Sequence, residues 1–533
     1  MIKLPIKIYL IAGMLFVSPF VSFSQSGNKP NWQNLDLKTD STFGISTEKA
    51  YKELLKGKKA TPVVVAVIDG GVDIDHEDLK AVIWTNPKEI AGNKKDDDKN
   101  GYIDDIHGWD FIGGPNGEIN YENLEATRIL RKLKPKFDNV TSEAAVSAAD
   151  KADYKLYLTV KEDVEKQYKD AKTSLDFYKR IKFVMDSIAA NIPQGTSVLD
   201  YFKAYQPTTR EQNNVRANVI RGLPQFADFE AYKKKVLGEA ITHYSEIVDY
   251  QVNLDFHPRD IVGDDPNNSK ERFYGNNNVN GPDAHHGSHV AGIIAAVRDN
   301  NIGIQGIADH AIIMSVRTVP NGDERDKDVA NAIRYAAANG AKVINMSFGK
   351  GYSWDKAVVD EAVKFAMSKD VLIIHAAGNE NKNLDADGVY NFPNKFYENN
   401  GGTAANWIEV GASGPKDNDK LKASFSNYGK KSVDVFAPGV LINSTIPGST
   451  YAEYSGTSMA CPVVVGLATL IREYYPKLTA AQVKDIILKT VVPVTHDVTV
   501  TDGKQIKKIP FTDLCVTGGI VNAYDALKLA GSM

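Results

Sequence analysis

Cysteine is nearly absent from this chain, whose 533 residues include only Cys461 and Cys515. Two thiols cannot build a disulfide framework or a cysteine-rich zinc module, so both classes of protein are excluded. The sequence does not decide whether the two cysteines pair with each other. We expect Cys461 to be a small, buried packing residue.

A surplus of positive charge is also missing. The 63 lysine and arginine residues are nearly balanced by 67 aspartate and glutamate residues, which gives a net charge of −4. Because phosphate binding usually requires a basic surplus, nucleic acid is excluded as the main partner. The composition, 43% hydrophobic and 24% charged, is that of a folded globular protein, which excludes disorder, collagen-like repeats and a polytopic membrane protein.

Long apolar runs are lacking except near the N-terminus. Lys3 and Lys7 precede a mostly apolar run at 8–23, and the small residue Ser24 follows it. This pattern predicts a cleaved signal peptide at 1–24, and hence a secreted or periplasmic protein. The alternative is a membrane anchor, but a proline interrupts the run. We therefore expect a protein that is not membrane-anchored.

Apolar runs alternate with helical stretches from residue 61 onward. The runs are Val63–Ile68, Ile312–Val316, Lys342–Met346, Val371–His375 and Trp407–Val410. Helix-like stretches between them include Asp328–Asn339 and Lys356–Ser368. Strands that are apolar throughout and separated by helices predict an α/β fold, with a parallel sheet covered on both faces. Ligands of such sheets gather at the carboxyl ends of the strands.

The segment 121–255 does not follow this alternation. It is rich in lysine and glutamate, and from Phe226 to Val248 apolar residues recur at spacings of three and four, which is typical of an amphipathic helix. The stretch 150–192 reads as one long helix or as two in succession. We predict an all-α insertion at 121–255 within a domain spanning 61–533. A coiled-coil arm is the alternative, although no strict heptad persists.

Three segments carry residue types that suit nucleophilic catalysis. They are VIDGGV, which contains Asp69, HGSHVAG, which begins with His286, and SGTSMACP, which contains Ser458. A serine hydroxyl needs a base to remove its proton as it attacks, and imidazole titrates near neutral pH. A carboxylate can orient that imidazole and stabilise its charged form. Ser458 follows a glycine at an expected helix start, where free N–H groups favour developing negative charge.

In this order, Asp then His then Ser, the segments resemble the subtilisin-like serine peptidases, the subtilase family. The resemblance covers about 61–121 and 255–529. It implies a subtilisin-like parallel sheet flanked by helices and an exported serine endopeptidase that hydrolyses peptide bonds through an acyl-enzyme. Asp69, His286 and Ser458 would form the triad, and no cofactor would be required for the chemistry.

Further residues match the family's pattern, with one departure. Asn379, in the segment AAGN, matches the side-chain donor to the oxyanion. Three consecutive residues resemble the strand that pairs with an extended substrate backbone, so the expected partners are protein or peptide substrates: Ser347, Phe348 and Gly349. Gly70 stands where the family usually has serine or threonine, so a hydroxyl that would support Asp69 is missing.

An acidic stretch, DDDKNGYIDD, has the spacing of a calcium loop. The ligands expected from this spacing, with a turn glycine between the third and fourth, are Asp96, Asp98, Asn100, the Tyr102 carbonyl and Asp104. The twelfth position is His107 and not glutamate, so the bidentate ligand is absent or comes from elsewhere. The prediction is a structural calcium ion; an exposed acidic turn is the alternative.

Other functions fit fewer of these residues. Gly-x-Ser-x-Ala around Ser458 approximates the nucleophile elbow of α/β-hydrolases, with Asp485 and His496 completing the order, but this leaves the first two motifs unexplained. A zinc enzyme using His285 and His289 would lack the glutamate of the zincin motif. A third alternative is a binding scaffold that has kept the fold without the activity.

Two expectations concern the segments outside the core. Residues 25–60 are too few to fold alone, so we expect them to pack on the catalytic domain through a helix at Lys49–Leu55. We expect no separate C-terminal domain after Leu529. The insertion lies within the 217 positions that separate Asp69 from His286, so its base must adjoin the cleft. We predict a helical subdomain beside the cleft that limits access; a remote docking appendage is the alternative.

Overall fold

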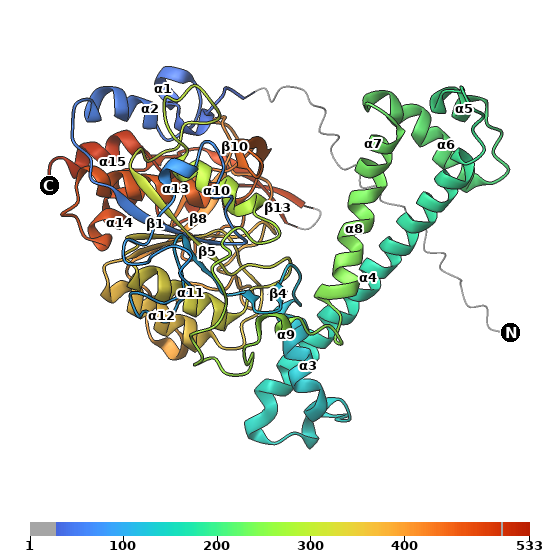
Figure 1. Cartoon of the computed structure of the whole chain (residues 1–533), viewed down its shortest axis with the longest axis horizontal. Helices are drawn as coiled ribbons and strands as arrows, with labels where there is room; N and C mark the ends of the chain where they lie inside the picture. Colours follow the sequence, from blue (N-terminus) through green and yellow to red (C-terminus); the bar gives the residue numbers. More distant parts are fainter. Residues whose placement is uncertain (1–27, 503–504) are drawn as a thin grey trace.

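A nine-stranded sheet forms the centre of the computed structural model, which describes residues 28–502 and 505–533 (Figure 1). The signal peptide predicted at 1–24 lies outside the described residues. The strand order is β12-β15-β9-β8-β7-β6-β1-β5-β2, and all neighbours are parallel except β12 and β15. The strands are β1 Val63–Asp69, β2 Gly108–Asp110, β5 Ala311–Arg317, β6 Val343–Met346, β7 Leu372–Ala376, β8 Trp407–Ser413, β9 Val435–Pro438, β12 Val492–Pro493 and β15 Gly519–Ile520.

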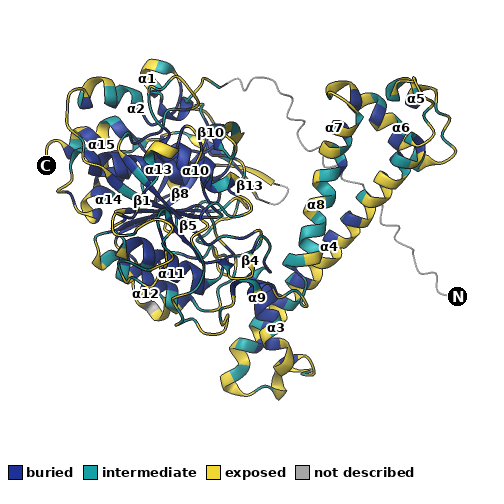
Figure 2. Ribbon diagram, viewed as in Figure 1, coloured by how far each residue is buried: buried dark blue, intermediate teal, exposed yellow. Residues whose placement is uncertain are grey.

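Helices cover both faces of this sheet, as the apolar runs predict. Val65 and Val67 of β1 point into a core that includes one helical layer, and Ala66 and Ile68 point into a core on the other face. Figure 2 shows buried residues along the strands of the sheet and the helices that cover it. This alternation explains why β1 is apolar at successive positions. The first layer contains α10 His285–Ala295, α13 Thr457–Tyr474, α14 Ala480–Lys489 and α15 Ala523–Ala530; the second contains α11 Asp326–Ala338 and α12 Lys356–Ser368.

The strand order reverses at β1. β1 pairs with β5 on one side and with β6 on the other, although β5 and β6 follow each other in the chain. The connections therefore diverge at the carboxyl end of β1, which is where ligands bind in open parallel sheets. Asp69 is the last residue of β1 and lies at this point.

The segment before β1 packs on the sheet body, as predicted. It contains α1 Leu37–Asp40, α2 Thr47–Ala50 and a π-helical turn at Tyr51–Leu55. Trp32, Ile45, Ala50 and Leu55 are buried in the same core as α13. Three two-stranded sheets complete the body: β3 Gly113–Gly114 with β4 Gly117–Glu118, β10 Ile442–Ile446 with β11 Thr450–Tyr454, and β13 Asp497–Asp502 with β14 Gln505–Pro510.

The remaining helices form an arm that projects from the body (Figure 1). They are α3 Glu125–Phe137, α4 Lys151–Ala189, α5 Val198–Ala204, α6 Arg210–Gly222, α7 Phe229–Lys233 and α8 Glu239–Glu246, and a short α9 Arg259–Val262 follows. α4 is a single helix of 39 residues, about 58 Å long at 1.5 Å per residue. α8 packs back along α4.

The base and the tip of this arm differ in their relation to the body. Its base has one apolar core and its tip has a second, separate one. The hairpin of α4 and α8 leads away from the sheet, so the tip formed by α5, α6 and α7 does not cover the body (Figure 1). At its base the arm packs against Tyr352 of the body. The predicted helical subdomain beside the cleft that limits access stays a prediction. Among the described residues, no helix is both long and apolar enough to cross a membrane.

Candidate active site

Asp69 and His286 lie in direct contact. Nδ1 of His286 is 2.8 Å from Oδ1 of Asp69 and 3.0 Å from Oδ2. Asp69 ends β1, and His286 is the second residue of α10. The start of α10 approaches β1 this closely because Gly287 has no side chain: a Cβ there would lie 2.1 Å from the Gly71 carbonyl oxygen. The glycine after His286 is therefore part of what places the imidazole.

The backbone replaces the hydroxyl that is missing at Gly70. The N–H of Gly70 donates a hydrogen bond of 2.8 Å to Oδ1 of Asp69. Asp69 is buried, at 2% exposure, and a buried carboxylate is costly unless hydrogen bonds satisfy it. With Gly70 on one side and His286 on the other, the carboxylate is held without a neighbouring serine or threonine.

The charge of Asp69 changes the basicity of His286. Burial opposes a positive charge on the imidazole, but the nearby carboxylate of Asp69 and the charge of Asp283 outweigh it, so the pKa of His286 is raised. The side chain of His286 is still 44% exposed. It can therefore reach a bound molecule while its Nδ1 is held by Asp69, which leaves Nε2 as the free basic atom.

Ser458 is the second residue of α13, which packs against α10. Its hydroxyl donates to the carbonyl oxygen of Ser347 at 3.0 Å, and not to His286. Its own carbonyl accepts a hydrogen bond of 3.0 Å from the Ser347 hydroxyl. That carbonyl is available because Pro462, four residues later, has no N–H to donate. His286 and Asp69 are thus joined by a hydrogen bond, whereas Ser458 is linked to His286 only by the packing of α13 against α10.

Asn379 lies at the N-terminus of α13. Its amide oxygen accepts hydrogen bonds from the Thr457 N–H at 2.8 Å and from the Thr457 hydroxyl at 3.1 Å. This fixes the amide so that Nδ2 is turned toward Gly456, where a Cβ would lie 3.7 Å from it. An amide donor therefore lies beside the first residues of α13, and the N-terminus of a helix favours negative charge.

The segment Ser347–Gly349 follows directly after β6. The pairing of β6 with β7 ends at Met346, and the next backbone pairing joins Lys350 to Phe392. The three residues between lie outside both of these pairings. Gly349 is closely approached by Asn391: a Cβ at this position would lie 2.2 Å from the side-chain oxygen of Asn391.

Comparison with known proteins agrees with this geometry. A model described as the subtilase family matches residues 60–513. The chain belongs to the subtilase family. Subtilisin NAT of Bacillus subtilis subsp. natto is 40% identical over 208 residues, which cover 38% of this chain and 50% of the relative. Subtilisin Savinase of Lederbergia lenta is 36% identical over 206 residues, which cover 38% of this chain and 69% of the relative. The chain thus spans about half the length of the first of these relatives.

Solved structures show weaker overall likeness. The structure described as the subtilase cytotoxin SubAB assembly has a TM-score of 0.39 and 24% identity, covering 47% of this chain and 77% of the other. A protease from Pseudoalteromonas arctica has a TM-score of 0.37 and 28% identity, covering 48% of this chain and 74% of the other.

Both cysteines of this subtilase are free and buried. Sγ of Cys461 lies 3.3 Å from the Asn345 side-chain oxygen and 3.3 Å from the Ile374 carbonyl oxygen. Burial raises the pKa of the Cys461 thiol, which keeps it neutral. The expectation of a packing residue is confirmed, and the two cysteines do not pair.

The acidic loop differs from the ligand set expected from its spacing. The carboxylates of Asp96 and Asp98 gather with that of Glu89, within 4.8 Å of one another. Among the described residues, Asp104 does not join this group; its carboxylate accepts a hydrogen bond of 2.7 Å from the Lys94 N–H. Sequence reasoning missed Glu89, because it precedes the loop and has no motif position.

Two other expected members of the loop are hydrogen-bonded within it. The N–H of Asn100 donates to both Asp96 and Asp98, at 3.0 Å each. The N–H of Tyr102 donates to the Asn100 side-chain oxygen at 2.8 Å. These bonds hold the loop in a tight turn with its carboxylates on the inside.

The residues that the esterase alternative requires have other partners in this subtilase. His496 is paired with Asp417, with 2.8 Å between Nε2 and Oδ1, and Asp485 is paired with Lys489 at 3.2 Å. Neither residue contacts Ser458 through a hydrogen bond in the described part of the chain. The residues that would complete the order Ser, Asp, His are thus engaged elsewhere.

The zinc-enzyme alternative also fails. His289 is buried, its Nε2 lies 3.0 Å from the carbonyl oxygens of both Ile442 and Ala452, and its ring stacks on Tyr454. Burial lowers its pKa to about 4. His285 instead lies in an exposed pair with Asp283. The two histidines therefore do not face a common metal.

Proposed function

We propose that this subtilase is a serine endopeptidase that hydrolyses peptide bonds through an acyl-enzyme on Ser458. The observation that carries the proposal is the 2.8 Å contact between Nδ1 of His286 and Asp69 at the carboxyl end of β1. The helix that bears Ser458 near its start packs against α10, the helix that bears His286. No cofactor enters the proposed chemistry, because the nucleophile, the base and the oxyanion donors are all side-chain or backbone groups.

Each residue has one role in the proposed reaction. Oγ of Ser458 attacks the substrate carbonyl carbon while Nε2 of His286 takes its proton, and Asp69 stabilises the resulting imidazolium. Nδ2 of Asn379 and the Ser458 N–H donate to the oxyanion. As the C–N bond breaks, His286 returns the proton to the leaving amine. Water then attacks the acyl-enzyme by the same route in reverse and frees the carboxylic acid.

Protein or peptide substrates are proposed to bind in extended form along Ser347, Phe348 and Gly349. Support comes from the position of this segment, which is outside both ladders and joined to Ser458 through Ser347. Main-chain hydrogen bonds along such an edge accept many sequences, so side-chain preference would be set by the flanking pocket walls.

We also propose a structural calcium ion in the acidic loop. Hard cations prefer carboxylate oxygens, and Oε2 of Glu89 is buried without a hydrogen-bond partner. Glu89, Asp96 and Asp98 would hold the ion, and it would take no part in the reaction. Export to the periplasm or medium is a further proposal, supported by the signal peptide predicted at 1–24.

Labelling with a fluorophosphonate tests the proposed function. The purified chain should be labelled at Ser458, and His286→Ala should lower the labelling rate because the base is lost. Ser458→Ala should abolish both labelling and casein hydrolysis. Ser368→Ala, which changes an exposed serine at the end of α12, is the control and should change neither. Labelling that persists in Ser458→Ala would contradict the proposal, and inertness of the wild-type chain would favour a scaffold.

A further inference from the structure

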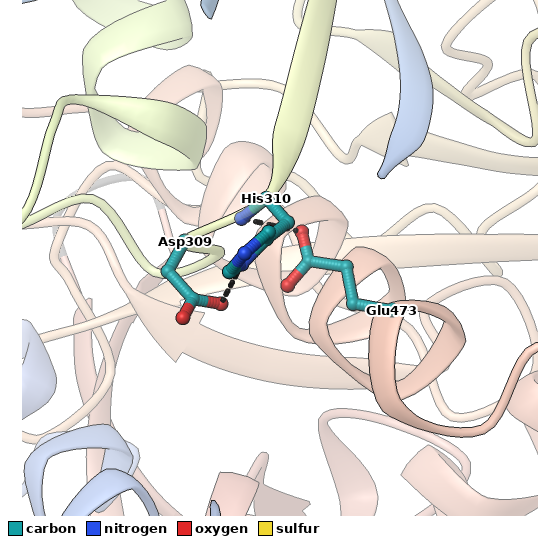
Figure 3. Close-up of side chains that lie close together, drawn as sticks. All are labelled: Asp309, His310 and Glu473. Carbon is teal, nitrogen blue, oxygen red and sulfur yellow. Dashed lines mark hydrogen bonds and ion pairs between the residues drawn. The ribbon is translucent and has the colours of Figure 1, made fainter. Parts of the chain in front are cut away.

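A second cluster of chemically active side chains lies at the far end of α13. Figure 3 shows Asp309, His310 and Glu473 turned toward one another. Asp309 and His310 directly precede β5, and Glu473 is the penultimate residue of α13. Ser458 lies near the other end of that helix, about 22 Å away at 1.5 Å per residue. The cluster is therefore separate from the catalytic residues.

The three ligand atoms are close enough for one ion. Nδ1 of His310, one oxygen of Asp309 and one oxygen of Glu473 all lie within 4.8 Å of one another. Nδ1 of His310 is 3.1 Å from Oδ1 of Asp309. Ligands at zinc distances of about 2.0–2.2 Å in a tetrahedron lie about 3.3 Å apart. The 3.1 Å between Nδ1 of His310 and Oδ1 of Asp309 is therefore close to the distance between two ligands of one zinc ion.

In each carboxylate one oxygen accepts a hydrogen bond from outside the three-residue cluster, and the other oxygen faces the cluster. Oδ2 of Asp309 accepts a hydrogen bond of 3.0 Å from the Tyr474 hydroxyl. Oε1 of Glu473 accepts one of 3.1 Å from the backbone N–H of His310. Oε2 of Glu473 is buried and accepts no hydrogen bond, and the buried Oδ1 of Asp309 is paired with Nδ1 of His310. Outer hydrogen bonds that orient a ligand are typical of metal sites, and a bound ion is one explanation for a buried carboxylate oxygen without a hydrogen-bond partner.

Glu473 gives the strongest support for a bound ion among the three residues. Its side chain is fully buried, at 0% exposure, and a buried carboxylate is costly unless it is paired or coordinates a metal. The guanidinium of Arg298 donates hydrogen bonds to Glu48 and to the Gly306 carbonyl, and not to Glu473. The side chain of His310 is 45% exposed, so an ion can enter from solvent on that side.

We propose that Asp309, His310 and Glu473 bind one divalent transition-metal ion, with zinc as the best match. One imidazole and two carboxylates are a ligand set that Zn²⁺ accepts in tetrahedral geometry, with water as the fourth ligand on the exposed side. Calcium and magnesium are a poorer match because they prefer oxygen ligands throughout.

The ion would stabilise a junction of three segments. The Thr61 N–H donates to the Glu473 carbonyl at 2.9 Å. The Tyr51 hydroxyl donates to the Ile307 carbonyl at 2.9 Å and accepts from the Asp309 N–H at 3.0 Å. The N-terminal segment, the start of β5 and the end of α13 therefore meet at the cluster, and the site is structural.

Zinc binding to the full chain tests this proposal. In a Ser458→Ala background, metal-free protein is dialysed against ZnCl₂ and bound zinc is measured by mass spectrometry. We expect one zinc ion per chain and a higher Tm. His310→Ala and Glu473→Gln should each weaken binding at least tenfold, since even the loss of an outer hydrogen bond costs 10-fold to 100-fold. The result does not depend on whether Ser458 is the nucleophile.

The matched control is His496→Ala. His496 is also paired with one aspartate, Asp417 at 2.8 Å, but among the described residues it has no third ligand group, so zinc binding should be unchanged. His310→Ala removes a partly exposed side chain and should fold even if Glu473→Gln does not.

The alternative to a metal ion is a proton shared between the carboxyl groups of Asp309 and Glu473. Burial and the charge of Asp309 raise the pKa of Glu473 well above its usual range. Equal zinc affinity in wild type and His310→Ala, or no bound zinc in the wild type, would overturn the metal site and favour two carboxyls that share a proton.

Discussion

Nζ of Lys350 lies 3.5 Å from a carboxylate oxygen of Glu125 and 2.8 Å from one of Asp326. Lys350 follows Gly349, the last residue of the proposed substrate-binding segment, and Glu125 is the first residue of α3. All three side chains are buried. The base of the arm is thus tied, through buried charges, to the strand edge where substrates are proposed to bind.

Lys350→Met should destabilise the protein by about 3–5 kcal/mol, because it leaves buried carboxylates without their partner. Urea unfolding of the Ser458→Ala chain at pH 7 is the measurement. Lys172→Met is the control: Lys172 and Asp176 form an exposed pair on α4, and exposed ion pairs contribute little to stability. Equal losses in both variants would show that the buried network adds nothing.

The same network predicts how stability falls in acid. Burial opposes the charge of Glu125, but Arg128 and Lys350 outweigh it and lower its pKa to about 2. A carboxyl with a lowered folded pKa stabilises the fold above its unfolded pKa, about 4.5. That contribution is lost as the pH falls from about 4.5 to about 2. In Lys350→Met this acid-dependent loss should be smaller in unfolding curves.

The pH dependence of peptide hydrolysis should follow His286. Its pKa is raised above 6.5 because Asp69 and Asp283 outweigh the effect of burial, so kcat/KM should rise with pH through a midpoint above 6.5. Asp69→Asn should lower that midpoint and reduce kcat by about 10⁴, as in related triads. His496→Ala should leave the midpoint unchanged. A midpoint that stays in place in Asp69→Asn would remove the aspartate from the proposed role.

Asn379→Ala should lower kcat by about 10²–10³ with little change in KM, the size known for the oxyanion asparagine of subtilisin itself. The donor acts on charge that develops only in the transition state. Asn383→Ala, in the neighbouring loop, is the control. An effect confined to KM would mean that the amide binds substrate and not the oxyanion.

Much of the sheet follows from the apolar runs. The run that predicts β1 lies in a strand with helices on both faces, so nearly every side chain is buried and the period-two alternation disappears. The strand extends one residue further, to Asp69. Asp69 pairs in register with Arg317 of β5. Because both residues are polar, a search for apolar runs ends each strand before them.

The arm and the two proposed metal sites are harder to predict from the sequence. An apolar stripe shows that a helix face is buried but not against what; Tyr178 of α4 stacks on Tyr244 of α8 and not on the body. Glu89 and Glu473 have no signature, because their partners approach only in the fold. The triad motifs were visible because their spacing lies within short segments.

Shortening the arm tests whether its tip controls access. Because Tyr178 and Tyr244 are neighbours across the hairpin, residues 182–240 can be replaced by a short Gly/Ser loop that keeps this contact. The tip lies away from the body (Figure 1), so rates on casein and on short peptides should change by less than about twofold. A selective rise on casein would restore the access function to the tip.

Calcium binding tests which of two ligand sets is correct: the one expected from the sequence spacing or the one that the structure brings together. Calcium should raise the Tm of the wild type, since a ligand that binds only the folded state adds about 2.7 kcal/mol at a concentration 100 times its Kd. Glu89→Gln should abolish the rise, because Glu89 gathers with Asp96 and Asp98. Asp104→Asn should retain it, because that carboxylate accepts from the Lys94 N–H and lies outside the group. Glu361→Gln, on exposed α12 surface, is the neutral control. Thermal unfolding with calcium and with a chelator decides: a rise lost in Asp104→Asn but kept in Glu89→Gln would favour the spacing and contradict the assembled site.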